Sequence, residues 1–390
     1  MRCTFGLDRG ILSFFPSAGT QALAISGIRY CGKSTLLAQL LKSYNQPSLY
    51  INFEDPRLFG FELSDFRLLD DIIAERKSEV LFFDEIQAVE RWELYVRQKL
   101  DEGFKVIIAG SNAALLSFEL RTKLADKLTI KEIFPFSYCE FLAFKRLTAD
   151  AKSWEKYLHT GGFPELVKTN NFNSLPTLLY AILTRDIVLQ HDIRDVDTLK
   201  RLAAYLISSV GGLVTAGKLH EPLGIKNTAT ILKFCSCLED SYLVNFLPKF
   251  SYSIKAQAIN PRKVYVVDPS LIEVASTSAT DGEEQKLENM VYWELRRKGY
   301  ELYYFSNDGQ ECDFVMIKNN HVEQLVQVCY ELTPANTARE HRGLHEAMKF
   351  FNTDNGIIVT NSQTESYLHN GRPISIVPAY RFISENLALI

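Results

Sequence analysis

The stretch that decides the fold spans residues 22–43 and reads ALAISGIRYCGKSTLLAQLLKS. Its centre, GIRYCGKS at 27–34, matches the pattern Gly-x-x-x-x-Gly-Lys-Ser in full. The apolar run before it predicts a strand and the amphipathic run after it predicts a helix, which is the context that this pattern requires. We therefore predict a glycine-rich loop whose backbone N–H groups, together with a helix N-terminus, bind phosphate.

The side chains of this loop suit a nucleoside triphosphate with Mg²⁺. Lys33 offers a positive charge to the β and γ phosphates, Ser34 offers a hydroxyl to Mg²⁺, and Thr35 is placed for a supporting phosphate contact. An accidental match is the alternative, and the flanking strand and helix count against it. The predicted nucleotide-binding residues are Gly27, Ile28, Arg29, Tyr30, Cys31, Gly32, Lys33, Ser34 and Thr35.

A second motif, VLFFDE at 80–85, is an apolar run that ends in two carboxylates. Alone it would indicate only a solvated strand end. Together with the loop, it predicts that Asp84 holds Mg²⁺ through the metal's water shell and that Glu85 orients and deprotonates the attacking water. The predicted metal residues are Ser34 and Asp84, and Lys33 and Glu85 are predicted to be catalytic.

A third apolar run, KVIIAG at 105–110, ends in Ser111 and Asn112. A polar side chain at this strand end can contact the attacking water or the γ phosphate, and we predict Asn112, ahead of Ser111, as a further catalytic residue. The alternative is an ordinary turn or helix N-cap, which both residue types favour. Short apolar runs alternating with amphipathic helices predict a doubly wound parallel sheet in an α/β fold.

Beyond residue 130 the pattern changes. It predicts a helical region from 131 with a loop at 161–167, then three helices over 199–243 and a strand hairpin, which together indicate a winged helix. The polar stretch 276–285 precedes a second α/β unit. A chain of 390 residues is expected to form two or three domains. We predict an ATPase domain at 1–140, a helical lid or connector at 141–197, a winged helix at 198–275 and an α/β domain at 276–390.

Composition narrows the classes of function. A net charge of −4 provides no overall basic field for nucleic acid or anionic lipid, so any DNA contact must be local. Seven cysteines, scattered and odd in number, are typical of reduced thiols. No apolar run is long enough to span a bilayer and the first residues lack a signal-peptide pattern, so we expect a cytoplasmic protein with no membrane partner.

These motifs, with others along nearly the whole chain, resemble those of prokaryotic AAA-type ATPases. That family carries a C-terminal domain of unknown function, built from a winged helix and a remnant of a PD-(D/E)XK nuclease fold. The resemblance implies ATP as the nucleotide, and the absence of an Asn-Lys-x-Asp guanine-reading motif agrees. The stretches that carry it, besides the loop, are FFDEIQ, AGSNAALLS, FPFSYCEFL, GGFPELV, TRDIVLQHDIRD, LENMVYWELRRKGY and ECDFV.

One departure concerns an arginine. Where the family commonly has a Gly-Arg pair, this chain reads LADK at 124–127, so γ-phosphate sensing by an arginine cannot be carried over to that position. Arg121 is a nearby candidate, and a solvated surface arginine is the stronger interpretation of it. The pattern predicts that another subunit or a protein partner supplies the arginine.

A second departure concerns the nuclease-like domain. The resemblance aligns Glu288 and Asp313 with two metal-binding carboxylates of that fold, but the third element reads Gln327-Val328-Cys329 and offers neither a carboxylate nor an ammonium. Glu323 and Glu331 are the nearby substitutes, and strand periodicity does not pair them with a lysine. We predict a degenerate nuclease domain that no longer cleaves.

DNA binding through the winged helix stays open at this point, with a protein contact or lid as the alternative. The helix from Asn227 to Tyr242 is not strongly basic. A nucleotide-dependent switch with little turnover and a DNA-processing nuclease are the competing functions. The basic side chains placed for phosphate contact are Lys218, His220, Lys226, Lys233, Arg262 and Lys263.

Overall fold

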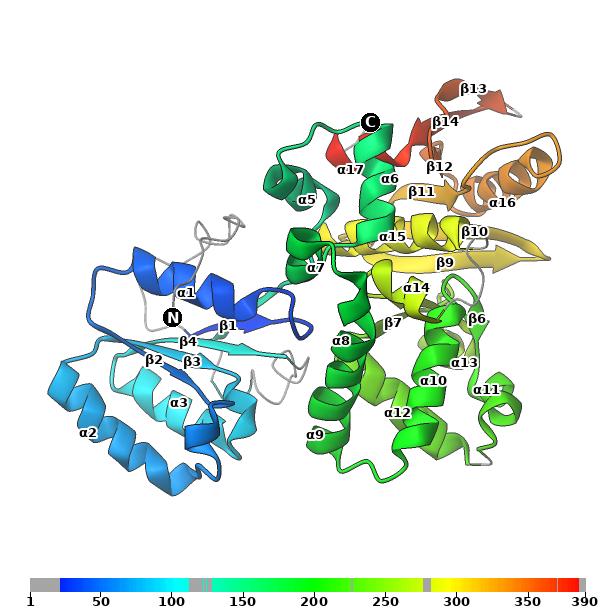
Figure 1. The fold of residues 1–390 in the computed structure, drawn as a ribbon. Helices are drawn as coiled ribbons and strands as arrows, with labels where there is room; N and C mark the ends of the chain where they lie inside the picture. Colours follow the sequence, from blue (N-terminus) through cyan, green and yellow to red (C-terminus); the bar gives the residue numbers. More distant parts are fainter. Residues whose placement is uncertain are drawn as a thin grey trace. The chain divides into compact units, whose positions relative to one another are not determined.

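The computed structural model describes residues 22–111, 122, 124, 128–225, 227–275, 282–369 and 371–385, and their chain forms two compact units (Figure 1). Unit 1 extends to Pro135 and includes Asp240–Tyr242, whereas unit 2 comprises 136–239 and the chain from Leu243 onward. Each unit is described separately below.

Unit 1 contains a five-stranded sheet in the order β2-β3-β4-β1-β5, and all neighbouring strands are parallel. Figure 1 shows α1 on one face of this sheet and α2 and α3 on the other, so the predicted doubly wound sheet is confirmed. Strand β4 lies between β1 and β3. The bounds are β1 Ala22–Ser26, α1 Lys33–Ser43, β2 Ser48–Asn52, α2 Phe66–Arg76, β3 Val80–Asp84, α3 Trp92–Asp101, β4 Lys105–Gly110 and β5 Leu128–Glu132.

The sheet of unit 1 is held by strands that are buried on both faces. Every residue of β1 and of β3 is buried, because their apolar runs have helices above and below them. Phe83 of β3 packs among the side chains of α2 and α3, where Phe66 and Tyr95 stack with ring centroids 4.0 Å apart. This packing fixes the carboxyl ends of β1, β3 and β4, from which the predicted site residues extend.

Unit 2 begins with a helical region that differs from the prediction in two places. The segment 131–146 is not one helix: β5 ends at Glu132, and α5 begins only after Ser137, whose hydroxyl accepts from Glu140 N at 3.2 Å in a capping box. The predicted loop 161–167 contains the start of α7, because Pro164 occupies the first helical turn, where proline is favoured. The helices are α5 Tyr138–Lys145, α6 Ala151–Thr160, α7 Pro164–Thr169, α8 Leu175–Ala181, a π-helix Ile182–Val188 and α9 Leu189–His191.

Three helices and a small sheet follow. The three predicted helices are present, and the predicted hairpin is part of a three-stranded antiparallel sheet in the order β6-β8-β7. Strand β6 has only two residues and is too short to leave a pattern in the sequence. The bounds are α10 Val196–Ser208, β6 Leu213–Val214, α11 Ala216–Leu223, α12 Thr228–Asp240, β7 Val244–Leu247, α13 Ile254–Ile259, β8 Arg262–Val266 and α14 Ser270–Ala275.

The chain ends in a second α/β unit, as predicted, built on a six-stranded mixed sheet in the order β13-β14-β12-β11-β10-β9. Helix α16 packs on β9 to β12, and α15 packs on β8, β9 and β11. The predicted boundary at 276–285 falls mostly outside the described residues. The bounds are α15 Glu283–Arg297, β9 Glu301–Asn307, β10 Gln310–Lys318, β11 His321–Val328, α16 Thr337–Phe350, β12 Gly356–Thr360, β13 Glu365–His369, β14 Arg372–Pro378 and α17 Ala379–Ser384.

A buried carboxylate anchors the start of α7 within unit 2. Asp268 accepts from Gly162 N at 2.6 Å and from the hydroxyl of Ser270 at 2.6 Å. The approach leaves no room for a side chain at Gly161, where a Cβ would lie 1.9 Å from the carboxylate. Burial raises the pKa of Asp268 to about 6, although these hydrogen bonds act in the opposite direction. The folded chain therefore binds a proton here more tightly than the unfolded chain.

This raised pKa predicts a pH-dependent difference between the native chain and Asp268→Asn. The stabilising effect of the proton is complete below pH 4 and is lost as the pH rises through about 6. Between pH 5 and pH 7 the free energy of unfolding of the native chain should therefore fall by about 1 kcal/mol relative to that of the asparagine variant, which does not titrate. Urea unfolding at both pH values measures this change, and parallel behaviour of the two chains would contradict it.

Candidate nucleotide-binding site

The glycine-rich loop leaves the end of β1 and leads into α1. Ile28 and Cys31 are wholly buried beneath it, whereas Tyr30 is half exposed. Gly27 has no room for a side chain, because a Cβ there would lie 2.0 Å from Ile133 O. The loop is thus fixed by its own buried side chains and by a close backbone approach. Ser34 and Thr35, in the first turn of α1, are exposed.

Lys33 is buried under the loop. Its Nζ donates to Gly27 O at 3.0 Å and to Ile28 O at 3.2 Å, and it lies 3.7 Å from Glu85 Oε1. The lysine side chain is only 3% exposed. The ammonium of the loop and the second carboxylate of the DE pair are therefore neighbours.

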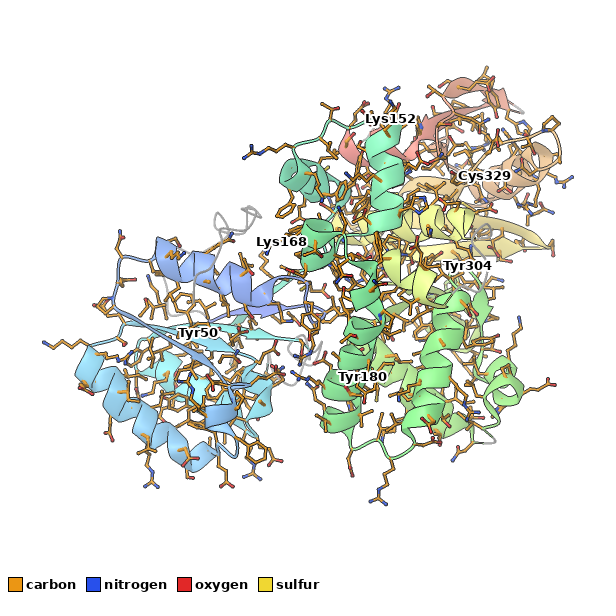
Figure 2. The ribbon with its side chains drawn as sticks, viewed as in Figure 1. Tyr50, Lys152, Lys168, Tyr180, Tyr304 and Cys329 are labelled. Carbon is orange, nitrogen blue, oxygen red and sulfur yellow. The ribbon has the colours of Figure 1, made fainter. Side chains whose placement is uncertain are left out.

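Asp84 is wholly buried at the end of β3. Tyr50, labelled in Figure 2, donates to its Oδ2 at 3.0 Å, and Ser34 forms a side-chain hydrogen bond with it. Burial raises the pKa of Asp84, an effect that the Ser34 hydrogen bond partly opposes. Its Oδ1 is buried and has no hydrogen-bond partner among the described residues. A buried carboxylate oxygen beside a serine hydroxyl fits Mg²⁺, a hard cation that prefers oxygen ligands.

Glu85 follows in a left-handed backbone conformation, with φ of 50°. Its Oε2 accepts from Ser111 N at 3.2 Å and from Gln87 Nε2 at 2.5 Å. The side-chain amide of Gln87 also lies 3.5 Å from Ser111 Oγ. The residue that follows β4 thus contacts the carboxylate that follows β3, because these strands are adjacent and parallel.

Sequence reasoning missed Gln87, although it lies within the FFDEIQ motif. The prediction for Asn112 falls outside the described residues, as do those for Arg121 and for 125–127. Of the strand-end pair, only Ser111 is described, and it is buried beside Glu85.

Arg29 was predicted only as part of the loop. Its guanidinium forms a two-pronged ion pair with Glu54, with NH1 at 3.0 Å from Oε2 and NH2 at 2.6 Å from Oε1. The pair ties the loop to the chain that follows β2, and bidentate arginine–carboxylate pairs are among the stronger polar contacts. The signal that could have indicated it is the acidic pair Glu54-Asp55 just after a predicted strand.

A polar cavity of about 320 Å³ lies in unit 2. Its lining includes Glu288, Asp313 and Gln327, the three positions that the resemblance aligned with a nuclease site. Glu323 and Glu331, the suggested substitutes, are not among its lining residues. The further carboxylates that line it belong to Glu284, Glu311 and Glu340.

Lys263 was expected to be available to a DNA phosphate, and the structure corrects this. Its side chain is 3% exposed and forms ion pairs with Glu288, Glu311 and Asp313. Lys226, another residue of that basic set, lies outside the described residues.

Family comparisons agree with the geometry of unit 1. An AAA domain family matches residues 19–142, and a domain of unknown function (DUF8612) matches residues 151–281. A parallel sheet with the glycine-rich loop after β1 and the carboxylate pair at the end of β3 defines an AAA-type P-loop ATPase domain.

Relatives match the chain over most of its length. An uncharacterized protein of Methanocaldococcus jannaschii is 35% identical over 356 residues, which cover 85% of this chain and 79% of that one. An uncharacterized protein of Haemophilus influenzae is 30% identical over 345 residues, covering 82% of this chain and 85% of that one. The chain belongs to the same family as these relatives, an AAA-type ATPase family with a C-terminal domain of unknown function.

Solved structures resemble the chain more distantly. A Walker-type ATPase of Pyrococcus abyssi is 14% identical, with a TM-score of 0.39, and the match covers 65% of this chain and 90% of that one. The Holliday junction branch migration motor RuvB of Thermotoga maritima is 16% identical, with a TM-score of 0.34, and the match covers 62% and 88%. No helix in the described part of the chain has both the length and the apolar character of a membrane span.

Proposed function

We propose that the chain binds ATP with Mg²⁺ at this site and hydrolyses it to ADP and phosphate. The observation that carries the proposal is the buried Oδ1 of Asp84, for which the described part of the chain offers no hydrogen-bond partner. Asp84 lies beside the P-loop lysine and serine and next to a second carboxylate. A buried oxygen acceptor without a partner is costly unless a ligand satisfies it. Ser34 and Asp84 would hold Mg²⁺.

The side chains divide the work as follows. Lys33 places a positive charge against the β and γ phosphates, and the backbone N–H groups of the loop bind the phosphate oxygens. Glu85 orients a water molecule and accepts its proton, since it is the carboxylate at the strand end nearest the lysine. Mg²⁺, when bound, neutralises charge on the phosphates. Asn112 contacts the attacking water or the γ phosphate in this proposal.

The contacts of Glu85 favour slow turnover by the isolated chain. Two donors, Ser111 N and the amide of Gln87, hold Glu85 Oε2, so this oxygen is engaged before any water arrives. We therefore keep the nucleotide-dependent switch as a second candidate, in which a partner or a second copy supplies an arginine and frees Glu85.

For unit 2 we propose a helical connector at 141–197, a winged helix at 198–275 and a nuclease-like α/β domain at 276–390. The helix and strand order from α10 to β8 supports the winged helix. The side-chain amide of Gln327 donates to Glu340 Oε2 at 2.7 Å, so the third element of the nuclease-like site presents an amide instead of a carboxylate. This arrangement supports a degenerate domain without cleavage activity.

The proposed Mg²⁺ contact is tested by Asp84→Asn. The amide retains an acceptor for Tyr50 but removes the negative charge that attracts the cation, so Mg²⁺-dependent ATP turnover should fall by about 100-fold or more. ATP binding in EDTA, measured with a fluorescent ATP analogue, should remain within about threefold of the native value, since no Mg²⁺ contact exists in either chain under these conditions. Unchanged turnover with full Mg²⁺ dependence would remove Asp84 from the site.

A further inference from the structure

Strand β8 and helix α15 are joined by buried polar contacts. The side-chain amide of Asn289, fully buried, accepts from Val266 N and donates to Val266 O, both at 2.9 Å. The indole of Trp293 also donates to Val266 O. An amide that satisfies both backbone groups of one strand residue holds the strand at one position along the helix. The three-stranded sheet is thereby held in register with the C-terminal α/β unit.

Lys263 extends from the same strand into a group of carboxylates. Its Nζ lies 2.7 Å from Asp313 Oδ1, 2.7 Å from Glu311 Oε1 and 3.1 Å from Glu288 Oε1. Tyr265, two residues on and therefore on the same face of β8, donates to the same oxygen of Glu288 at 2.7 Å. The ammonium stands where side chains from β8, β10 and α15 converge.

The charges explain why this lysine stays protonated. Burial alone would lower the pKa of Lys263. Attraction by Asp313 and Glu288 outweighs that effect, so the pKa lies well above its ordinary value. Burial likewise raises the pKa of Glu288, and Lys263 opposes that rise. A buried ammonium is tolerated only when paired and hydrogen-bonded. The ammonium and the carboxylates therefore each offset the cost of burying the other.

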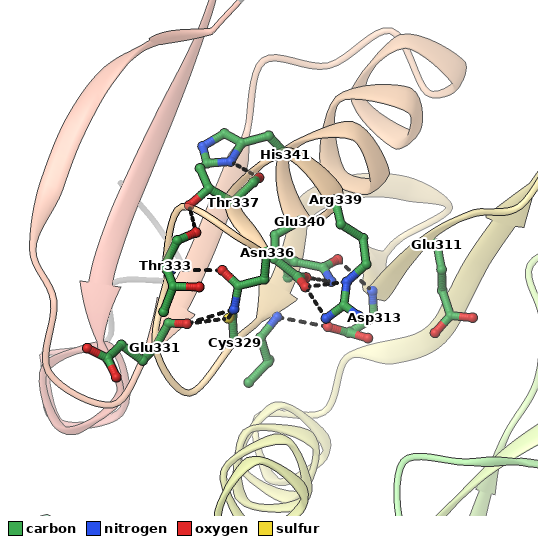
Figure 3. Close-up of polar contacts among 12 residues, drawn as sticks. Glu311, Asp313, Cys329, Glu331, Thr333, Asn336, Thr337, Arg339, Glu340 and His341 are labelled. Carbon is green, nitrogen blue, oxygen red and sulfur yellow. Dashed lines mark hydrogen bonds and ion pairs between the residues drawn. The ribbon is translucent and has the colours of Figure 1, made fainter.

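The second oxygen of Asp313 and the carboxylate of Glu340 have partners of their own. Asp313 Oδ2 accepts from Val328 N at 2.8 Å, whereas Lys263 contacts the other oxygen, Oδ1; Figure 3 shows the Asp313 side chain. The carboxylate of Glu340 accepts hydrogen bonds from the side-chain amide of Gln327 and from the guanidinium of Arg339, as the dashed lines in Figure 3 mark. Glu288, Glu311 and Asp313 thus all form ion pairs with the same ammonium, that of Lys263.

We propose that Lys263 is an internal cation, which fills the place among Glu288, Glu311 and Asp313 that a divalent cation would need and ties β8 to β10 and α15. Carboxylate oxygens suit hard divalent cations, but an ammonium already within 3.1 Å of all three both fills the space and repels a second cation. Within the described ranges, no group of three or more histidine, cysteine, aspartate or glutamate side chains is arranged to hold a metal ion. The proposal does not depend on the ATPase activity.

The test is Mn²⁺ binding to the nucleotide-free full-length chain, followed by electron paramagnetic resonance. It compares the native chain, Lys263→Met and the double variant Lys263→Met/Asp313→Asn. Methionine keeps the length and apolar packing of the lysine stem but removes the charge. We expect Lys263→Met to bind one additional Mn²⁺ at least about tenfold more tightly than the native chain, as loss of an adjacent like charge predicts. The second substitution should abolish that gain.

Any Mn²⁺ bound at Asp84 is common to all three chains and cancels in the comparison. A folded Lys263→Met chain, as judged by circular dichroism, that gains no Mn²⁺ overturns the proposal. If this variant does not fold, native and Asp313→Asn chains are compared instead. Equal Mn²⁺ binding by these two supports an internal cation, whereas weaker binding by Asp313→Asn shows that metal already uses the cluster and overturns it.

Discussion

Replacing Lys33 with alanine should abolish ATP turnover and weaken nucleotide binding. The ammonium is buried under the loop on the carbonyls of Gly27 and Ile28, so its charge is already fixed where the phosphates would bind. Removing one preorganised charge from a phosphoryl-transfer site costs about 100- to 1,000-fold in rate. Steady-state phosphate release, together with titration of a fluorescent ATP analogue, measures both effects.

Lys42→Ala is the matched control for this variant, because Lys42 lies on the same helix α1 and is exposed. It should turn over ATP within about twofold of the native chain, as expected for a surface substitution away from the site. If Lys33→Ala kept native turnover while remaining folded, the loop would not be the site of ATP chemistry.

Replacing Glu85 with glutamine should stop hydrolysis but leave binding intact. Glutamine has nearly the same shape, so it can still accept from Ser111 N, yet it cannot take a proton from water. We expect turnover to fall by about 100-fold or more while the dissociation constant for Mg²⁺-ATP changes by less than about threefold. Single-turnover kinetics with labelled ATP separates these two quantities.

The same variant distinguishes the two candidate functions. A hydrolysis-driven protein loses its cellular role when Glu85 becomes glutamine, whereas a switch is held in its ATP-bound form and keeps the role of that form. Glu79→Gln, at an exposed position just before the same strand β3, is the control and should behave as the native chain. Equal loss of binding and turnover in Glu85→Gln would contradict the assignment of Glu85 as the base.

The fold of unit 1 was predictable because its signals are local. Apolar runs at 22–26 and 80–84 are buried on both faces, and the carboxyl ends of such parallel strands meet at one edge of the sheet. That rule, applied to the two motifs alone, places Lys33 and Glu85 together. The hydrogen bonds of Gln87 and Ser111 to Glu85 were missed, since they depend on the course of the chain after each strand.

Unit 2 was less predictable because its decisive contacts join residues that are far apart in the sequence. The glycines at the start of α7 suggest a turn, and a loop was expected there, whereas Pro164 begins a helix. Lys263 resembles a surface cation in the sequence because none of the four residues on either side of it is acidic. Its partners Glu288 and Asp313 are separated from it by 25 and 50 residues. Only tertiary packing places three carboxylates around it.

The central claim is tested most directly by the release of phosphate from Mg²⁺-ATP by the native chain and by Glu85→Gln, purified identically. The account predicts release that requires Mg²⁺, that is faster with ATP than with GTP, and that falls by about 100-fold or more in the variant. Equal rates in the two chains would contradict it, because hydrolysis would then occur without the carboxylate that follows β3.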